Sequence, residues 1–276
     1  MFSKIFTNSL YKEPSLEEPV SQVCTFEQFL SPEYERISKA LNEVFRFHRK
    51  QWEFIYIVRC LEKSNILKEG SRGLVFGVGR EKLPSYFASM DCKITATDLS
   101  SLNGPNNWQN TNQHCSCKKD LFHKALISED KFEKNVSFEE VDMNNVPKHL
   151  IDYDFCWSSC ALEHIGGLES GFNFIKNSLN CLKPGGIAVH TTEFNLSSNI
   201  NTFESDGSSI YRKKDIENFA EEMLEEGHEL YLNFNIGESI RNFEVDEERL
   251  NKDFHLKIKI QDFISTSFGF FIKKRK

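Results

Sequence analysis

The sequence of 276 residues contains no apolar run that approaches the roughly 18 residues needed for a membrane-spanning helix. Its first residues include no long apolar segment followed by a small-residue cleavage site, so we expect no secretory signal. Glycine (14 residues) and proline (7 residues) are sparse and no internal repeat is present, which excludes collagen-like and low-complexity proteins. These absences predict a globular protein of the cytoplasm that has no membrane span.

Basic residues are in the minority, with 34 Lys and Arg against 41 Asp and Glu and a formal net charge of -7. An acidic protein gains little from the release of counterions on a polyanion, so nucleic acid is not favoured as a partner. The basic run at residues 273–276 is most simply a solvated tail.

The eight cysteines are scattered along the chain. Cys115 and Cys117 lie close together, but no second pair stands at the spacing of a zinc site. This usage is typical of reduced, mostly buried thiols in a cytoplasmic protein, since several cysteines lie within apolar runs: Cys60, Cys156, Cys160 and Cys181.

The hydrophobic pattern changes twice along the chain. Residues 1–30 show no clear period, which predicts a loosely structured arm, and helical periodicity then runs from Pro32 to about residue 68. After Gly70, short apolar segments alternate with helical segments. The expected strands are residues 73–77, 93–98, 136–141, 154–158, 187–191, 228–236 and 263–272, and the expected helices are residues 82–90, 118–127, 168–182 and 213–226.

Strands that alternate with helices form parallel pairs joined by right-handed crossovers, with helices on both faces. The sequence therefore predicts an α/β fold, namely a Rossmann-like, open, seven-stranded and mainly parallel sheet with a helical N-terminal extension. Residues 1–69 would form an N-terminal arm and helical cap, and residues 70–276 the α/β domain. Ligands of such sheets bind beyond the carboxyl ends of the strands, so functional residues are expected there.

The first expected strand ends in the turn Gly77-Val78-Gly79. Two glycines two residues apart let the backbone turn sharply and approach a ligand closely. The third glycine of a dinucleotide fingerprint is missing, since its position holds Lys82. Asp98 ends the second strand 19 residues after Gly79, where a carboxylate can bind ribose hydroxyls.

With these residues, the chain resembles the class I S-adenosylmethionine-dependent methyltransferases from about residue 73 to residue 194. Further motifs carry the resemblance: Asp142, Ser158-Ser159, Leu162-Glu163-His164-Ile165 and Leu182-Lys183-Pro184-Gly185-Gly186. The resemblance implies S-adenosyl-L-methionine as the cofactor. It implies contacts to the methionine part from Gly77, Gly79, Glu81, Ser158 and Ser159, to the ribose from Asp98 with Leu99 beside it, and to the adenine from Asp142 and Met143.

A narrower likeness covers residues 48–52, 108–114 and 190–195, which are similar to an uncharacterised bacterial branch of this family. That branch is associated with surface-polysaccharide biosynthesis, which implies a carbohydrate or another small polar molecule as the methyl acceptor. Arg49 and Lys50 are most simply a solvated helix face, with a contact to an anionic acceptor as the alternative.

Methyl transfer from a sulfonium depends mainly on placing the acceptor and the methyl group in line, because the leaving group is neutral. A sugar hydroxyl must also lose its proton, and a general base contributes about 10²–10⁴-fold. His164 is the first choice for this base, with helix capping or packing as its alternative role. Glu163, His190 and Glu193 are further candidates, although a buried structural histidine is the alternative reading of His190.

The pair Glu163-His164 is also similar to metal-assisted members of the family, in which a Glu-x-x-Glu-His cluster and a later histidine bind a divalent ion. Here Cys160 replaces the first glutamate, so a divalent metal is possible but not favoured. Glu193 or His190 would complete such a site.

Two other functions share part of this pattern. An NAD-dependent oxidoreductase would have the same first β-α-β unit, but the missing third glycine and the lack of a suitably placed Tyr-x-x-x-Lys pair argue against it. A catalytically silent S-adenosylmethionine-binding partner protein would keep the cofactor residues without an acceptor site. The polar residues at positions 163, 164, 190 and 193 favour an enzyme.

Overall fold

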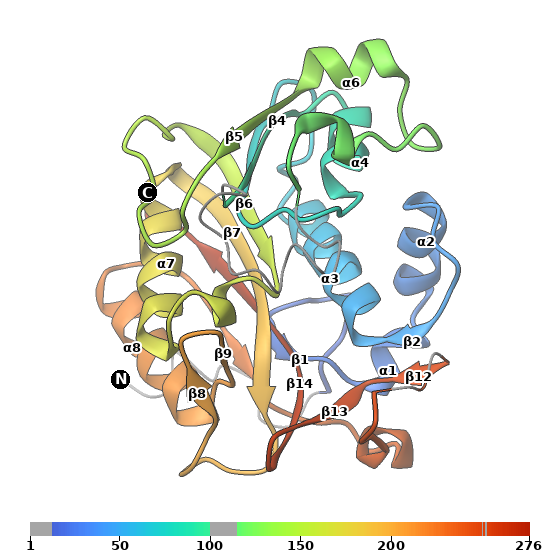
Figure 1. The fold of residues 1–276 in the computed structure, drawn as a ribbon, viewed down its shortest axis with the longest axis vertical. Helices are drawn as coiled ribbons and strands as arrows, with labels where there is room; N and C mark the ends of the chain where they lie inside the picture. Colours follow the sequence, from blue (N-terminus) through green and yellow to red (C-terminus); the bar gives the residue numbers. More distant parts are fainter. Residues whose placement is uncertain (1–12, 100–114, 250, 252) are drawn as a thin grey trace.

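The computed structural model describes residues 13–99, 115–249, 251 and 253–276. Ten strands among these residues form one mixed sheet, in which most neighbouring pairs are parallel (Figure 1). Eight of them follow the order β5 (Val136–Glu140), β4 (Lys93–Asp98), β3 (Arg72–Val75), β6 (Tyr153–Ser159), β7 (Leu182–Asn195), β14 (Phe263–Lys273), β1 (Ser21–Val23) and β10 (Leu232–Asn233). The predicted α/β class with a mainly parallel sheet is confirmed.

Helices cover both faces of the sheet (Figure 1). One face carries α3 (Arg49–Lys63), α4 (Leu83–Ser89) and α6 (Glu129–Asn135), with α2 (Pro32–Ala40) packed on α3 and α1 (Phe26–Phe29) beside α2. The other face carries α7 (Leu168–Asn180) and α8 (Lys213–Glu225). None of the helices in the described ranges is long and apolar enough to cross a bilayer.

The pleat of the strands divides the interior into two cores. Phe155 and Trp157 of β6 pack toward α3 and α4, whereas Cys156 between them packs toward α7. Because successive side chains of a strand point to opposite faces, a strand buried on both sides reads as a continuous apolar run. Strand β6 follows this rule, and Ser158 and Ser159 end it at the carboxyl edge of the sheet.

The prediction of a loosely structured arm over residues 1–30 is wrong for residues 21–23, which form β1 inside the sheet. Gln22 pairs antiparallel with Gly269 of β14, and Ser21 pairs parallel with Leu232 of β10. β1 thus separates β14 from β10, the short remnant of the strand expected over residues 228–236. Three residues are too few to show a period, so the sequence pattern does not reveal this strand.

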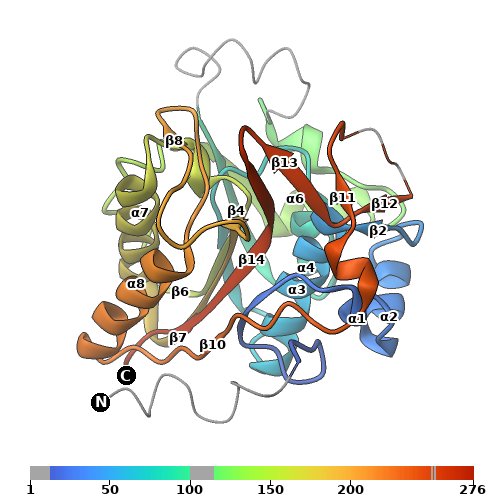
Figure 2. The same cartoon turned by 90° about the horizontal axis from the view of Figure 1, so that it is seen from below.

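The segment at residues 118–127 also differs from the expected helix. It contains the 3₁₀-helix η2 (Lys118–Leu121) followed by a turn, and the regular helix α6 begins only at Glu129. Additional short strands lie on the side of the molecule that carries α1 and α2, away from α7 and α8 (Figure 2), namely β11 (Val245–Asp246), β13 (Lys257–Ile260) and the pair β2 (Phe47–His48) and β12 (Phe254–His255).

Helix α3 is fixed closely against β14. A Cβ at Gly269 would lie 2.1 Å from the Tyr56 ring, so only glycine permits this approach. The Tyr56 hydroxyl donates to the carbonyl oxygens of Gly269 (3.1 Å) and Val20 (2.6 Å). This contact holds the first turn of α3 beside the carboxyl ends of β6 and β7.

Candidate functional site

The glycine turn after β3 has the backbone geometry that its sequence predicts. Gly77 and Gly79 have φ angles of +58° and +52°, which favour glycine. A Cβ at Gly77 would lie only 2.8 Å from Cβ of Ala161 and 3.3 Å from Sδ of Met143. The turn therefore lies against both the segment after β6 and the segment after β5.

Asp98 connects this turn to the end of β4. Its Oδ2 accepts hydrogen bonds from the amides of Gly79 (3.0 Å) and Cys115 (3.1 Å), and its Oδ1 accepts one from Leu99 (2.9 Å). The carboxylate is thus held by three backbone donors next to the glycine turn. Such preorganisation suits a group that must bind a ligand in a fixed position.

Glu81 is directed toward β6. Its Oε1 accepts a hydrogen bond from Nε1 of Trp157 at 2.6 Å. Burial raises the pKa of Glu81 to about 8, against the effect of this hydrogen bond, which lowers it. The carboxyl group is therefore largely protonated at neutral pH, and it joins the glycine turn to the central strand.

The two residues expected near the adenine lie in different environments. Met143 is buried and lies against the Gly77 turn, as the distance above requires. Asp142 is exposed, and its Oδ1 accepts a hydrogen bond from the amide of Asn144 at 2.9 Å. Met143 therefore lies against the glycine turn, whereas Asp142 stabilises the loop after β5 through its hydrogen bond with Asn144.

Ser158 and Ser159 end β6 and point to opposite faces. The Ser158 hydroxyl lies 2.8 Å from Nδ1 of His190, on the α7 side. The Ser159 hydroxyl donates to Oε2 of Glu53 at 3.0 Å, on the α3 side. Only Ser159 therefore joins the polar residues at the start of α3.

His190 is enclosed in the core. Its ring is fully buried, Nε2 lies 3.0 Å from the Ser178 hydroxyl, and Phe174 packs edge-on against it. Burial lowers the pKa of His190 to about 3, so the ring is neutral at neutral pH. These contacts match the structural role that the sequence left open for His190, and we do not include it in the proposed site.

Charged side chains gather where α3 meets the ends of β6 and β7. We call this group the charged cluster: Arg49, Lys50, Glu53, Cys160, Glu163 and Glu193. Glu53 lies at its centre with no exposed surface, and four side chains donate hydrogen bonds to its carboxylate: Ser159 (3.0 Å), Cys160 (3.1 Å), Thr191 (3.2 Å) and Ser267 (2.5 Å).

Glu193 is the anionic partner of the two cations. Its Oε1 lies 2.6 Å from Nη2 of Arg49 and 3.6 Å from Nζ of Lys50, and its Oε2 accepts a hydrogen bond from Ser265 at 2.8 Å. Burial by itself raises the pKa of Glu193, but the two cations outweigh it and lower the pKa to about 2. Glu193 is therefore ionised at neutral pH and is a poor proton acceptor.

The pKa of Glu163 is shifted in the opposite direction to that of Glu193. Burial raises its pKa, and the negative charge of Glu193 adds to this effect. Its Oε2 accepts a hydrogen bond from Thr192 at 3.2 Å, whereas its Oε1 is buried without a hydrogen-bond partner among the described residues. An unsatisfied buried carboxyl oxygen costs free energy and is typical of functional positions.

His164 follows Glu163 in the 3₁₀-helix η3 (Leu162–His164). Its Nδ1 lies 2.7 Å from the carbonyl oxygen of Gly207, so Nδ1 carries the proton in the neutral ring. Nε2 is then the proton acceptor, and it lies 3.8 Å from Oε1 of Glu163. The side chain is 29% exposed, which leaves it within reach of a ligand.

The charged cluster also contains a potential metal-ligand set. The ligand atoms of Cys160, Glu163 and Glu193 lie within 4.8 Å of one another, and a thiol with two carboxylates can bind a divalent cation. However, Arg49 already pairs with Glu193, and Lys50 lies 3.4 Å from Glu53. Burial raises the pKa of the Cys160 thiol, which donates to Glu53 rather than standing ready as a thiolate. Two of the three ligand groups therefore already have partners, since Glu193 pairs with Arg49 and the Cys160 thiol donates to Glu53.

The sequence predicted the environment of some residues at the start of α3 but not of others. A solvated helix face is wrong for Arg49, whose side chain is 5% exposed, while Lys50 is 39% exposed. Trp52 lies in the core, stacked on Tyr56. Glu53 was missed, although its spacing from Arg49 and Lys50 (i, i+4 and i, i+3) is that of helical ion pairs. The loop at residues 108–114, with Trp108, lies outside the described residues.

No protein-family model and no curated protein matches this sequence, but solved structures do. TehB from Haemophilus influenzae matches with 15% identity and a TM-score of 0.50, over 88% of this chain and 67% of that one. A putative methyltransferase from Bacillus halodurans matches with 14% identity and a TM-score of 0.49, over 80% of this chain and 99% of that one. A putative sarcosine dimethylglycine methyltransferase from Galdieria sulphuraria matches with 18% identity and a TM-score of 0.36, over 53% of this chain and 46% of that one.

This chain therefore spans less than half the length of the Galdieria protein. Together with the strand order, the likeness to TehB shows a Rossmann-like α/β fold, which is the fold that the resemblance to class I S-adenosylmethionine-dependent methyltransferases predicts. At these identities the likeness concerns the fold, and function has to be argued from the site.

Proposed function

We propose that this chain is an S-adenosylmethionine-dependent methyltransferase that methylates an oxygen of a carbohydrate or another small polar acceptor. The observation that carries the proposal is the pair Glu163 and His164. Oε1 of Glu163 is buried without a hydrogen-bond partner in the described part of the chain and lies 3.8 Å from Nε2 of His164, at the same edge of the sheet as the glycine turn and Asp98.

The donor side of the proposed site consists of Gly77, Gly79 and Asp98. S-Adenosylmethionine would supply the methyl group as an electrophile on a positively charged sulfur. The glycines permit close approach of the backbone, and Asp98 would bind the ribose hydroxyls. Glu81, Leu99, Asp142, Met143, Ser158 and Ser159 are further proposed cofactor contacts from the resemblance, with Ser158 the weakest because its hydroxyl faces His190.

Glu163 and His164 form the acceptor side of the proposed site. In this proposal Nε2 of His164 takes the proton of the acceptor hydroxyl as the oxygen attacks the methyl group, which gives a neutral thioether as the leaving group. The positive charge that His164 gains would lower the pKa of Glu163, so that the carboxylate 3.8 Å away would ionise and stabilise the imidazolium. Glu193 is held by Arg49 and would keep the charged cluster in place rather than accept protons. No step in this proposal requires a divalent metal.

A catalytically silent binding partner is the second candidate, because the donor residues alone do not require an acceptor. Oε1 of Glu163 has no hydrogen-bond partner among the described residues, and this supports the enzyme because an acceptor hydroxyl could supply the missing partner. The carbohydrate is supported by the narrower resemblance over residues 48–52 and 190–195.

Calorimetric titration with S-adenosylhomocysteine, with NAD as the control ligand, tests the donor side. We expect one-site binding of S-adenosylhomocysteine and none of NAD. Asp98→Ala should weaken binding by at least about 100-fold, because a charged hydrogen-bonding partner is lost. The matched variant Asp142→Ala should weaken it less. Binding of NAD alone would overturn the proposal, and release of S-adenosylhomocysteine with a panel of sugars tests the acceptor side.

A further inference from the structure

A two-stranded hairpin lies beside α7 in both views of the fold (Figures 1 and 2). Its strands β8 (Glu204–Ser205) and β9 (Ser208–Ser209) pair antiparallel, and residues 206–207 form the loop between them. Ser205 closes this loop, since its hydroxyl donates to the carbonyl oxygen of Ser208 (3.0 Å) and accepts from the amide of Ser208 (3.1 Å). The hairpin is therefore held together by its own hydrogen bonds, although residues 204–207 are exposed.

The tip of the hairpin contacts His164. The carbonyl oxygen of Gly207 lies 2.7 Å from Nδ1 of His164. Because a carbonyl oxygen can only accept, this contact requires the proton of the neutral ring on Nδ1 and leaves Nε2 as the acceptor. Nε2 is the nitrogen that takes the proton in the proposed reaction. The tautomer of His164 thus depends on a segment that lies 43 positions away in the chain.

A second contact joins the hairpin to the start of α7. Oε1 of Glu204 accepts a hydrogen bond from the amide of Leu168, the first residue of the helix, at 2.9 Å. Gly167 precedes the helix and has no side chain to cap it, and a Cβ there would lie 2.7 Å from Oε1 of Glu204. A carboxylate at a helix N-terminus satisfies a free amide and interacts favourably with the helix dipole. Glu204 therefore takes the place of the missing capping side chain and fixes the hairpin to α7.

The two contacts flank the short connection between η3 and α7. Gly166 and Gly167 form this connection, with φ angles of +106° and +100° that favour glycine. Two glycines have no side chains that could hold the neighbouring His164 in one orientation. The hairpin supplies a carbonyl contact on one side of the glycines and a carboxylate contact on the other.

We propose that the β8–β9 hairpin orients His164 as a proton acceptor, and that Glu204 is the positioning residue that holds the hairpin in place. This inference rests on the proposed function, in which His164 is the general base. Glu204 would act only through the Gly207 carbonyl and the His164 ring. Without the Glu204 contact the hairpin tip would move away from the ring, and the proton could then reside on either nitrogen. The share of molecules in which Nε2 can accept a proton would fall.

Nuclear magnetic resonance of the full chain, with isotope-labelled histidine, tests the orientation of His164 without any substrate. The chemical shifts of the two ring nitrogens report which of them carries the proton. At mildly alkaline pH, where an ordinary imidazole is neutral, we expect the proton of His164 on Nδ1 in the parent. Glu204→Ala should give a mixture of both tautomers. Glu204→Gln retains an oxygen that can accept from Leu168 and should keep the proton on Nδ1.

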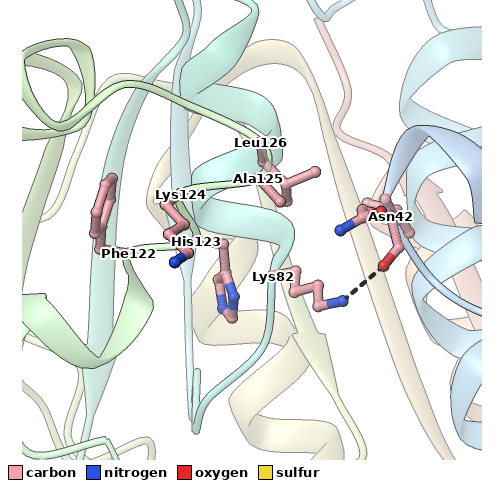
Figure 3. Close-up of a pocket in the computed structure, with 8 residues that line it drawn as sticks. Asn42, Lys82, Phe122, His123, Lys124, Ala125 and Leu126 are labelled. Atoms are coloured by element: carbon pink, nitrogen blue, oxygen red, sulfur yellow. Dashed lines mark hydrogen bonds between the residues drawn. The ribbon is translucent and has the colours of Figure 1, made fainter.

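Two controls make this measurement specific. Asp206→Ala removes the same charge from an exposed position of the same hairpin and should leave the His164 tautomer as in the parent. His123 is an internal reference in the same spectra, because it lines a pocket between the end of α2 and the start of α4, on the other face of the sheet from α7 (Figure 3). Its ring signals should be the same in all variants. Glu204→Ala combined with Ser205→Ala also removes the bonds that close the loop, and should change the tautomer most.

Enzyme kinetics test the consequence for catalysis. Glu204→Ala should lower kcat for methyl transfer by about tenfold, as expected for a misplaced catalytic group, with KM for S-adenosylmethionine as in the parent. Glu204→Gln should recover most of this loss, and Asp206→Ala should show none. Unchanged affinity for S-adenosylhomocysteine would show that the variants are folded.

A parent ring with its proton on Nε2 would overturn the inference. A tautomer that stays the same even in the double variant would also overturn it, and so would equal kcat values in the parent and Glu204→Ala. If the parent transfers no methyl group to any acceptor, the proposed function fails, and the tautomers alone then support or overturn the orientation of His164 by the hairpin.

Discussion

The two faces of β7 place neighbouring residues in opposite environments. His190 faces α7 and is surrounded by apolar side chains and two serine hydroxyls, so its ring is neutral. Glu193 faces α3 and is ionised between Arg49 and Lys50. One strand thus carries a neutral core histidine and a buried carboxylate only three residues apart.

The difference shows that nearness in sequence is a poor guide to shared chemistry within a strand. Because side chains alternate, His190 and Glu193 cannot line one pocket, although the sequence grouped them as catalytic candidates. The polar residues that Glu193 does meet come from α3 and β14, far away in the chain. The three predictions below would break or sharpen this contrast between the charged face and the neutral face.

We expect the largest effect on stability on the charged face of β7, which is the face that carries Glu193 and packs against α3. Arg49→Met removes the cation between Glu53 and Glu193 and leaves buried carboxylates without their partner. The free energy of unfolding should fall by about 3–5 kcal/mol in urea denaturation, as when one partner of a buried ion pair is removed. The control is Arg36→Met, because Arg36 is 48% exposed and its surface pairs with Glu33 and Glu62 should each contribute at most about 1 kcal/mol. Equal losses in the two variants would contradict a buried charged cluster.

A smaller effect is expected on the neutral face. His190→Asn should lower the free energy of unfolding at pH 7 by about 1–3 kcal/mol, because Ser158 and Ser178 lose part of their hydrogen bonding. The pH dependence is the more specific readout.

In the parent, the folded-state pKa of His190 is about 3, below its ordinary value of 6.5. Between these values the unfolded chain binds more protons than the folded one, so stability is fully present above pH 6.5 and is lost as the pH falls. The loss from this group should reach about 1.4 kcal/mol per pH unit and should be absent in His190→Asn. An unchanged acid profile in the variant would show that the ring is accessible to solvent and protons.

Most of the central sheet was predictable from sequence, and the reason is physical. Strands β3 and β6 and the middle of β7 are buried on both faces, so each reads as an apolar run between turn residues, whereas β4 alternates apolar residues with threonines. The glycine turn was predictable because glycine adopts positive φ angles more readily than other residues do. Asp98 was predictable because it follows an expected strand at the spacing from the glycines that suits ribose binding. Strand β1 was not predictable, since its three residues gain their structure only from pairing with β14 and β10.

Single residues of the charged cluster could be predicted from the sequence, but the contacts between them could not. Glu163, Glu193 and Cys160 stand out in the sequence because they follow strands, whereas Glu53 looks like any helix residue. The link between α3 and β7 is a contact between residues 138 positions apart, exemplified by Thr191 donating to Glu53. No local pattern contains such a contact. The neutral state of His190 is equally non-local, because it depends on Ser178 and Phe174 of α7.

The smallest effect on stability is expected for His164, which lies at the end of the charged face near solvent. His164→Gln should change the free energy of unfolding by at most about 0.5 kcal/mol, because the side chain is partly exposed and its contacts are peripheral. The same variant should lower methyl transfer by about 10²–10⁴-fold if His164 is the general base, with the affinity for S-adenosylhomocysteine unchanged. His149→Gln, at a histidine that is 63% exposed, should leave both quantities as in the parent. If His164→Gln is as unstable as Arg49→Met and keeps its activity, then His164 belongs with His190 as a structural residue, and its proposed role as the general base is contradicted.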